Sequence, residues 1–133
     1  MHWWKSTVRI PAAVYYRSVW PRRCHDCSDG GLAVAAAEMC ISGEIGAKLD
    51  ISAMGDLSAE RKLFSESNTR WIAEVEEKDA AEFEKIMGKD AVCIGRTGGD
   101  RFIVKGTSID ISVEEMRKAW NDPIWKLMGG AAE

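Results

Sequence analysis

Two short polar segments of the chain carry residue types that bind anions. The first runs from Cys24 to Gly31 (CHDCSDGG), where short polar side chains are followed by two glycines and then by an apolar helical pattern. This order predicts a helix N-terminus capped by Ser28 or Asp29. Because glycines leave backbone N–H groups uncovered at the positive end of a helix dipole, an anion can approach closely there. The alternative is a capped helix with nothing bound.

The second segment runs from Ser65 to Arg70 and combines hydroxyls, a carboxylate and a guanidinium within six residues. An arginine can grip a phosphate through two parallel hydrogen bonds, and serine hydroxyls add neutral donors. These residue types suit recognition of a ribose phosphate. The alternative is a structural turn in which Arg70 pairs with Glu66.

The four cysteines do not form the pattern of a disulfide framework. Cys24 and Cys27 form one C-x-x-C, a spacing found in redox pairs and in half of a zinc site. A structural zinc site needs four ligands, and Cys40 and Cys93 fall inside a helical and a strand pattern. We therefore predict no metal site, and a reducing, cytoplasmic compartment.

The composition is that of one ordinary globular domain. The 133 residues are 46% hydrophobic and 29% charged, with a net charge of −3. That charge is too small to predict binding to nucleic acid or to a membrane surface. The sequence also has no apolar run long enough to cross a membrane.

Residues 1–23 differ in composition from the rest of the chain, with five basic residues, no acid and three of the six tryptophans. Arg9 and Pro11 interrupt any apolar stretch, which argues against a secretory signal. We predict an atypical basic aromatic leader over 1–23, either poorly ordered or packed onto the core. A transit peptide, a nucleic-acid arm and a frame-altered remnant are the alternatives. The folded domain is then expected over 24–128, with a tail over 129–133.

The remaining chain mixes helical and strand patterns. Helices are expected over 32–42, 59–64, 78–87, 113–120 and 124–128, and strands over 45–51, 71–76, 91–97, 100–105 and 109–111. Gly98-Gly99 between two strand-like runs predicts a two-residue hairpin. The mixture predicts the α+β class, a mostly antiparallel mixed sheet with helices packed on one face.

Three motifs occur in register: HDCSDGGLAVAAAEM, LFSESNTR and CIGRTGGDRFIV. Together they resemble the C-terminal domain of the synthetase subunits of phosphoribosylformylglycinamidine synthase, in the aminoimidazole ribonucleotide synthetase-like family of ATP-dependent enzymes. The resemblance runs from His25 to about Leu127 and ends abruptly at Cys24. It implies the α+β layout of that domain. It also implies a part in purine biosynthesis, as the substrate phosphate-binding piece of the ligase that amidates formylglycinamide ribonucleotide.

The resemblance further implies a site. In the family, the glycine-rich loop after His-Asp contributes to the phosphoribosyl pocket, and the LFSES run with its following arginine belongs to the substrate cleft. Carried over residue by residue, the substrate- and phosphate-binding candidates are Asp26, Ser28, Asp29, Gly30, Gly31, Ser65, Glu66, Ser67 and Arg70. No catalytic residue is assigned, because the family's acid–base candidates lie mainly in the preceding ATP-binding domain, which 23 residues cannot hold.

The resemblance implies that ATP and Mg²⁺ are held chiefly by that preceding domain, so no cofactor is expected on this chain alone. The expected partners are formylglycinamide ribonucleotide or another ribose phosphate, a separate ATP-binding domain, a glutaminase subunit that supplies ammonia, and a small bridging subunit. The isolated chain is expected to be inactive. The alternative is a stand-alone phosphate- or nucleotide-binding module, or an inactive relic of the synthase.

Overall fold

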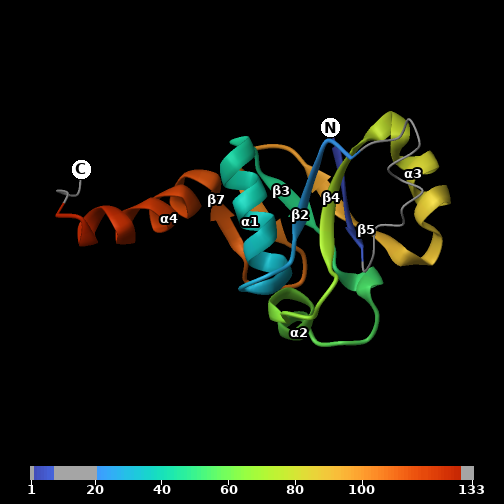
Figure 1. The fold of residues 1–133 in the computed structure, drawn as a ribbon, viewed down its shortest axis with the longest axis horizontal. Coiled ribbons are helices and arrows are strands. Elements are labelled where there is room, and N and C mark those ends of the chain that lie inside the picture. Colours follow the sequence, from blue (N-terminus) through green and yellow to red (C-terminus); the bar gives the residue numbers. More distant parts are fainter. Residues whose placement is uncertain (1, 8–20, 130–133) are drawn as a thin grey trace.

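A computed structural model describes residues 2–7 and 21–129 of the protein. Within these residues the chain forms one seven-stranded sheet and four α-helices (Figure 1). The strands are β1 (His2–Thr7), β2 (Arg23–Asp26), β3 (Ala47–Leu49), β4 (Trp71–Glu76), β5 (Ala91–Thr97), β6 (Arg101–Val104) and β7 (Asp110–Ser112). The helices are α1 (Gly31–Gly43), α2 (Ala59–Phe64), α3 (Ala80–Met87) and α4 (Val113–Leu127). Short 3-10 turns lie at Ser52–Met54, Glu77–Asp79 and Gly88–Asp90.

The sheet has the order β2-β4-β1-β5-β3-β6-β7. β3 and β6 are parallel, whereas every other neighbouring pair of described strands is antiparallel. The predicted α+β class with a mostly antiparallel mixed sheet is therefore confirmed. None of the described helices is both long and apolar enough to span a membrane.

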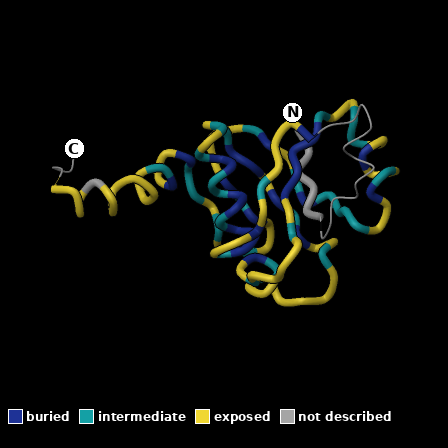
Figure 2. Tube along the Cα trace, in the orientation of Figure 1, coloured by how far each residue is buried: buried dark blue, intermediate teal, exposed yellow. Residues whose placement is uncertain are grey.

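The apolar core lies in two clusters on the two faces of the sheet. The larger cluster joins α1, α2 and the start of α4 to one face, and buried residues run along α1 and the strands behind it (Figure 2). In the smaller cluster, Phe83 and Met87 of α3 pack against Ala73 and Val75. Ile72 belongs to the larger cluster, and neighbouring residues of a strand point to opposite faces. The prediction of helices on one face therefore describes α1, α2 and α4, while α3 covers the other face.

The predicted hairpin at Gly98-Gly99 is wrong. β3 lies between β5 and β6, antiparallel to β5 and parallel to β6. The two glycines still turn the chain, but around Gly46, whose N–H donates to the Gly99 carbonyl and whose carbonyl accepts from the Gly98 N–H, both at 2.8 Å. A Cβ atom on Gly46 would lie 2.3 Å from the Arg101 carbonyl oxygen. Glycine at position 46 is thus what lets β3 enter between the two strands.

The predicted leader contains an internal strand of this sheet. β1 pairs antiparallel with β4 on one side and with β5 on the other, and β2 begins at Arg23, before the expected domain boundary. Over His2–Thr7, the expected leader is therefore paired with the sheet. Composition does not reveal this, because strand pairing uses backbone N–H and C=O groups that every residue but proline carries. Arg9 and Pro11, and the tail over 130–133, lie outside the described residues.

The last helix begins as predicted and ends later. The Ser112 hydroxyl accepts from the Glu115 N–H at 3.1 Å, and the Glu115 carboxylate accepts from the Ser112 N–H at 3.0 Å, so the two residues form a capping box. The predicted break before Pro123 is wrong, because α4 continues through it. The proline removes one helical hydrogen bond, and the Ala119 carbonyl left over belongs to an exposed residue that water can reach.

The position of β1 can be tested at Ser6, which lies opposite Ile72 of β4 and Val92 of β5, beyond the register shift between Trp4 and Lys5. Proline has no N–H to donate and is poorly tolerated in a strand that is paired on both sides. We expect Ser6→Pro to lower the free energy of unfolding by roughly 2 kcal/mol, measured by urea denaturation, because an acceptor on a neighbouring strand loses its donor. Ser6→Ala is the control, since it removes the same side chain but keeps the N–H. Equal stability of the two variants would contradict a central β1.

Candidate functional site

α1 begins at a turn made by two glycines in the left-handed region, Gly30 with φ +79° and Gly31 with φ +65°. Glycine adopts this conformation without the strain that a Cβ atom brings. The predicted cap by Ser28 or Asp29 is wrong, because the N-cap position falls on Gly30, which has no side-chain cap. The Ser28 hydroxyl instead donates to the Asp26 carboxylate. This hydrogen bond is the main reason why the pKa of Asp26 is lowered.

A carboxylate from the second polar segment reaches the start of α1. The Gly30 N–H donates to Glu66 Oε1 at 2.9 Å, across 36 residues of sequence. A negative charge is favourable there because it meets the positive end of the helix dipole. Glu66 therefore accepts the hydrogen bond from Gly30 at the helix N-terminus where a bound anion was expected.

Arg70 is directed at the C-terminal end of α2. Its Nη1 donates to the carbonyl and the hydroxyl of Ser65, at 3.1 and 2.6 Å, and its Nη2 donates to the Lys62 carbonyl at 2.9 Å. The last carbonyls of a helix have no partner within the helix, so the guanidinium supplies the missing donors. The alternative pairing of Arg70 with Glu66 is therefore wrong, since Glu66 caps α1 and Arg70 caps α2.

The two polar segments are in direct backbone contact. A Cβ atom on Gly31 would lie 2.7 Å from the Ser65 carbonyl oxygen and 2.8 Å from that of Leu63. The Cys27 N–H also donates to the Arg70 carbonyl at 2.9 Å. The predicted residues of the two segments are thus brought together where the start of α1 meets the end of α2.

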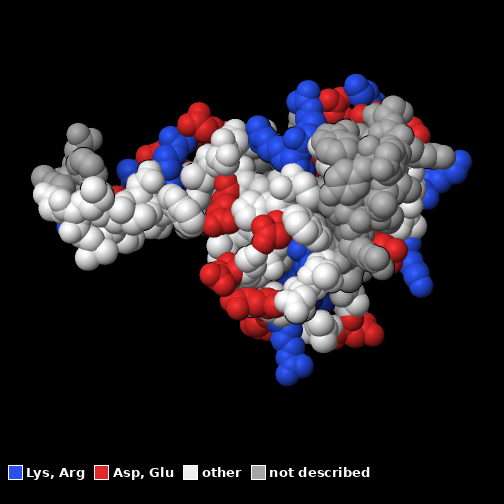
Figure 3. Space-filling view, in the orientation of Figure 1, with Lys and Arg blue, Asp and Glu red and all other residues white. Residues whose placement is uncertain are grey.

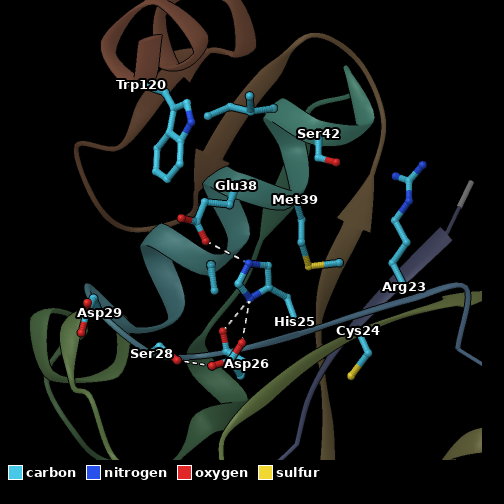
Figure 4. Close-up of a pocket in the computed structure, with 12 residues that line it drawn as sticks. Arg23, Cys24, His25, Asp26, Ser28, Asp29, Glu38, Met39, Ser42 and Trp120 are labelled. Carbon is cyan, nitrogen blue, oxygen red and sulfur yellow. Dashed lines mark hydrogen bonds and ion pairs between the residues drawn. The ribbon is translucent and has the colours of Figure 1, made fainter. Parts of the chain in front are cut away.

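A groove of about 910 Å³ opens between β2, α1 and α4. Asp26, Ser28 and Asp29, three of the predicted site residues, line it. His25 lies between Glu38 and Asp26 in this groove (Figure 4). Its Nε2 is 2.9 Å from Glu38 Oε2, and its Nδ1 is 3.4 Å from Asp26 Oδ1. The imidazole therefore links the edge strand β2 to α1 and helps to place Asp26.

A smaller cavity of about 240 Å³ lies at the end of α2 and holds the predicted Ser65, Ser67 and Arg70. Lys62 and Lys89 also line it, with Asp90 as the one acid among the described lining residues. Three basic groups and two hydroxyls give this cavity the chemistry of a phosphate site. Sequence reasoning missed the two lysines. No spacing rule connects Lys89, which follows α3, to residues 65–70.

The thiols near the site have raised pKa values, whereas a redox pair has a lowered one. Burial raises the pKa of Cys27, and partial desolvation together with the Asp26 carboxylate raises that of Cys24. Reactive C-x-x-C thiols have a lowered pKa. Cys40, on the buried face of α1, has its pKa raised to about 12 by burial. Over residues 2–7 and 21–129, no three His, Cys, Asp or Glu side chains are grouped so as to hold a metal ion.

Comparison with known proteins identifies the family. Residues 10–106 match the family model described as "AIR synthase related protein, C-terminal domain". The chain therefore belongs to the family of AIR synthase related C-terminal domains, and the resemblance found in the sequence motifs is confirmed. The match also begins before Cys24, so the abrupt end expected there is wrong.

Among curated relatives, the PurL subunit of phosphoribosylformylglycinamidine synthase from Moorella thermoacetica is 39% identical over an alignment of 110 residues, which covers 78% of this chain and 15% of the relative. The subunit from Thermoplasma volcanium is 40% identical over an alignment of 106 residues, which covers 72% of this chain and 13% of the relative. The chain thus spans only a small part of the length of these relatives.

Solved structures show the same fold. PurL from Thermotoga maritima complexed with AMPPCP gives a TM-score of 0.71 at 13% identity, over 87% of this chain and 25% of that one. PurL from the same organism complexed with FGAR gives a TM-score of 0.63 at 18% identity, over 73% and 18% of the two chains. These likenesses cover most of this chain and show its fold.

The close contact at Gly31 can be tested with a matched pair of glycines. Gly106 also has a left-handed φ, +78°, but a Cβ atom there would meet nothing within 4 Å. We expect Gly106→Ala to lower the free energy of unfolding by about 1 kcal/mol through backbone strain alone. Gly31→Ala should lower it by about 3 kcal/mol, because the backbone at Leu63 and Ser65 must also move. Similar losses in urea denaturation would mean that the contact between α1 and α2 does not constrain position 31.

Proposed function

We propose that this chain supplies the substrate-binding side of a phosphoribosylformylglycinamidine synthase, a ligase of purine biosynthesis that works in the cytoplasm. Membership of the AIR synthase related family and the likeness to PurL subunits support this proposal. The observation that carries it is the junction of the two polar segments, where Gly30 bonds Glu66 and Gly31 packs on Ser65. Asp26, Ser28 and Asp29 line the larger groove, and Ser65, Ser67 and Arg70 line the smaller cavity. We assign these two cavities to different parts of one ribonucleotide.

The phosphate of formylglycinamide ribonucleotide is assigned to the smaller cavity. Lys62, Lys89 and Arg70 provide positive charge, and Ser67 provides a hydroxyl. A guanidinium has five N–H donors, so Arg70 can hold the end of α2 and still interact with a phosphate oxygen. Positive charge and several donors together are what a phosphate dianion requires.

The uncharged part of the substrate is assigned to the larger groove. Asp26 and Asp29 would repel a phosphate, but carboxylates accept hydrogen bonds from ribose hydroxyls and amide N–H groups. Ser28 can act with them once its hydroxyl turns from Asp26. Gly30, Gly31 and Glu66 hold the two segments in register and need not contact the substrate.

ATP-dependent amidation requires groups that we assign to other parts of the enzyme. Phosphoryl transfer needs an anchored nucleotide, magnesium ions and positive charge around the transferred group. We assign ATP and Mg²⁺ to a separate ATP-binding domain, and ammonia supply to a glutaminase subunit with a small bridging subunit. This chain then contributes by positioning the substrate, which can supply several kcal/mol of a reaction barrier.

The phosphate assignment can be tested by titrating the full chain with ribose 5-phosphate in a calorimeter. We expect Lys89→Ala to weaken binding roughly tenfold, the value of one charge-assisted hydrogen bond. Lys105→Ala is the control, because Lys105 forms an ion pair with Asp50 at 2.7 Å and does not line the cavity. Equal weakening by the two substitutions would indicate a general charge effect. A chain that binds no ribose 5-phosphate would contradict the assignment.

The division of labour can be tested by measuring formation of formylglycinamidine ribonucleotide with ATP, Mg²⁺ and high ammonia in place of the glutaminase. We expect no measurable rate from this chain alone. A mixture with a separately expressed ATP-binding domain should be active, because positioning and charge stabilisation are then both present. Turnover by this chain alone would refute the assignment of ATP to another domain. Binding of ribose 5-phosphate without activity in the mixture would favour a stand-alone binding module.

A further inference from the structure

The turn between α2 and β4 holds one residue in an unfavourable backbone conformation. Thr69 has a φ of +67°, in the left-handed region. This conformation is disfavoured for a β-branched residue, because the side chain crowds the following carbonyl group. The Thr69 side chain is exposed, so its burial does not offset the strain. Its hydroxyl donates to the Asn68 carbonyl at 2.6 Å, a hydrogen bond within the turn itself.

The chain is fixed on both sides of this turn. Before the turn, the Glu66 carboxylate is bonded to the start of α1. After the turn, Arg70 is bonded to the end of α2 through its guanidinium, and to the segment between β2 and α1 through its carbonyl. Residues 67–69 must therefore reverse the chain between two fixed points. A strained residue persists where the surrounding structure determines its conformation in this way.

The turn sets the relative position of two side chains in the smaller cavity. Ser67 and Arg70 stand on either side of the strained residue, and both line the cavity, whereas Thr69 is not among the described residues that line it. A change of the backbone torsions at Thr69 would move the Ser67 hydroxyl relative to the Arg70 guanidinium. Acidic side chains gather over α1 and the turn before it (Figure 3), so a phosphate depends on the donors of this cavity.

A different residue at position 69 would form the turn with less strain. Glycine adopts a left-handed conformation freely, but it also adopts many others. Asparagine tolerates this conformation as well, yet the left-handed position falls one residue after Asn68. A threonine has a stiff side chain, and here its hydroxyl also holds the preceding carbonyl. The turn is therefore more strained than a glycine turn but restricted to fewer conformations.

We propose that Thr69 is a positioning residue, whose strained turn holds Ser67 and Arg70 in place for the substrate phosphate. This inference rests on the proposed function of the smaller cavity. A turn that is fixed before binding loses less conformational entropy when the ligand arrives. Thr69 therefore raises the affinity for phosphate without contacting it, at some expense in the stability of the fold.

The test is calorimetric titration of the full chain with ribose 5-phosphate, with Glu44→Gly as the matched control for Thr69→Gly. Glu44 also has a left-handed φ, +51°, but it lies at the end of α1 and lines neither cavity. We expect Thr69→Gly to weaken binding roughly fivefold, because the added freedom of the turn must be lost on binding. Glu44→Gly should bind within about twofold of the unaltered chain.

Thermal unfolding separates positioning from stability. Both glycine substitutions should shift the unfolding midpoint by less than about 3 °C, because relief of strain opposes the larger entropy of the unfolded chain. Thr69→Ser keeps the Cβ atom and the hydroxyl, so its affinity should stay within about twofold of the unaltered chain. Without ligand, Thr69→Gly should speed hydrogen exchange of the Cys27 amide at least threefold, since this amide bonds the Arg70 carbonyl.

The outcomes separate this inference from the proposed function. Unchanged affinity of Thr69→Gly, equal weakening by Glu44→Gly, or unchanged exchange of the Cys27 amide would overturn the positioning role. The phosphate assignment would still stand if Lys89→Ala weakened binding. Loss of affinity in Thr69→Ser as large as in Thr69→Gly would also overturn it, because the hydroxyl would then have no part in holding the turn. An unaltered chain that binds no ribose 5-phosphate would overturn both the proposed function and this inference.

Discussion

The contact between the start of α1 and the end of α2 is the constraint on which the candidate site depends. The two backbones approach so closely that position 31 has no room for a Cβ atom between the Ser65 and Leu63 carbonyls. At the same place the Glu66 carboxylate accepts from Gly30, and Arg70 supplies donors to the end of α2. One junction thus satisfies two helix ends at once. These hydrogen bonds stabilise the contact between the two polar segments, which are far apart in the sequence.

The same junction gives the charged residues a structural task as well as a proposed functional one. Arg70 orders Ser65 through its carbonyl and hydroxyl, and both residues line the smaller cavity. A side chain that is already held by the fold loses little conformational freedom when a ligand binds. Glu66 is likewise committed to α1, which keeps its negative charge fixed at the helix N-terminus. The hydrogen bonds that stabilise the fold therefore also hold Ser65, Glu66 and Arg70 in place before a ligand binds.

The sheet decides where this junction lies. β2 and β4 pair so that Asp26 is opposite Trp71, which places the residues just beyond both strands side by side. β1 separates β4 from β5, and β3 separates β5 from β6. Both insertions use segments that are distant in sequence from their neighbours. The face covered by α1 carries the larger groove, and α3 closes the opposite face with Phe83 and Met87.

The local elements could be predicted from the sequence because their signals are local. The helices expected over 59–64 and 113–120 begin at Ser58 and Ser112, whose hydroxyls accept from backbone N–H groups three residues later. The alternation over Trp71–Glu76 and the helical spacing after Leu32 arise in the same way. The motifs around Asp26 and Ser65 likewise indicate the family through their residue types and order. The nine candidate residues were found by this resemblance, whereas their binding roles stay predictions.

Only the tertiary structure decided what depends on contacts between distant segments. The Gly98-Gly99 signal is ambiguous, because two glycines turn the chain equally well around a partner strand as into a hairpin. The strand at His2–Thr7 could not be predicted from its amino-acid composition, because strands pair through backbone groups. The carboxylate that meets α1 comes from Glu66 instead of a neighbouring residue, and Lys89 joins the smaller cavity from beyond α3. Sequence spacing determines which residues share an element, but the packing of elements determines which side chains meet.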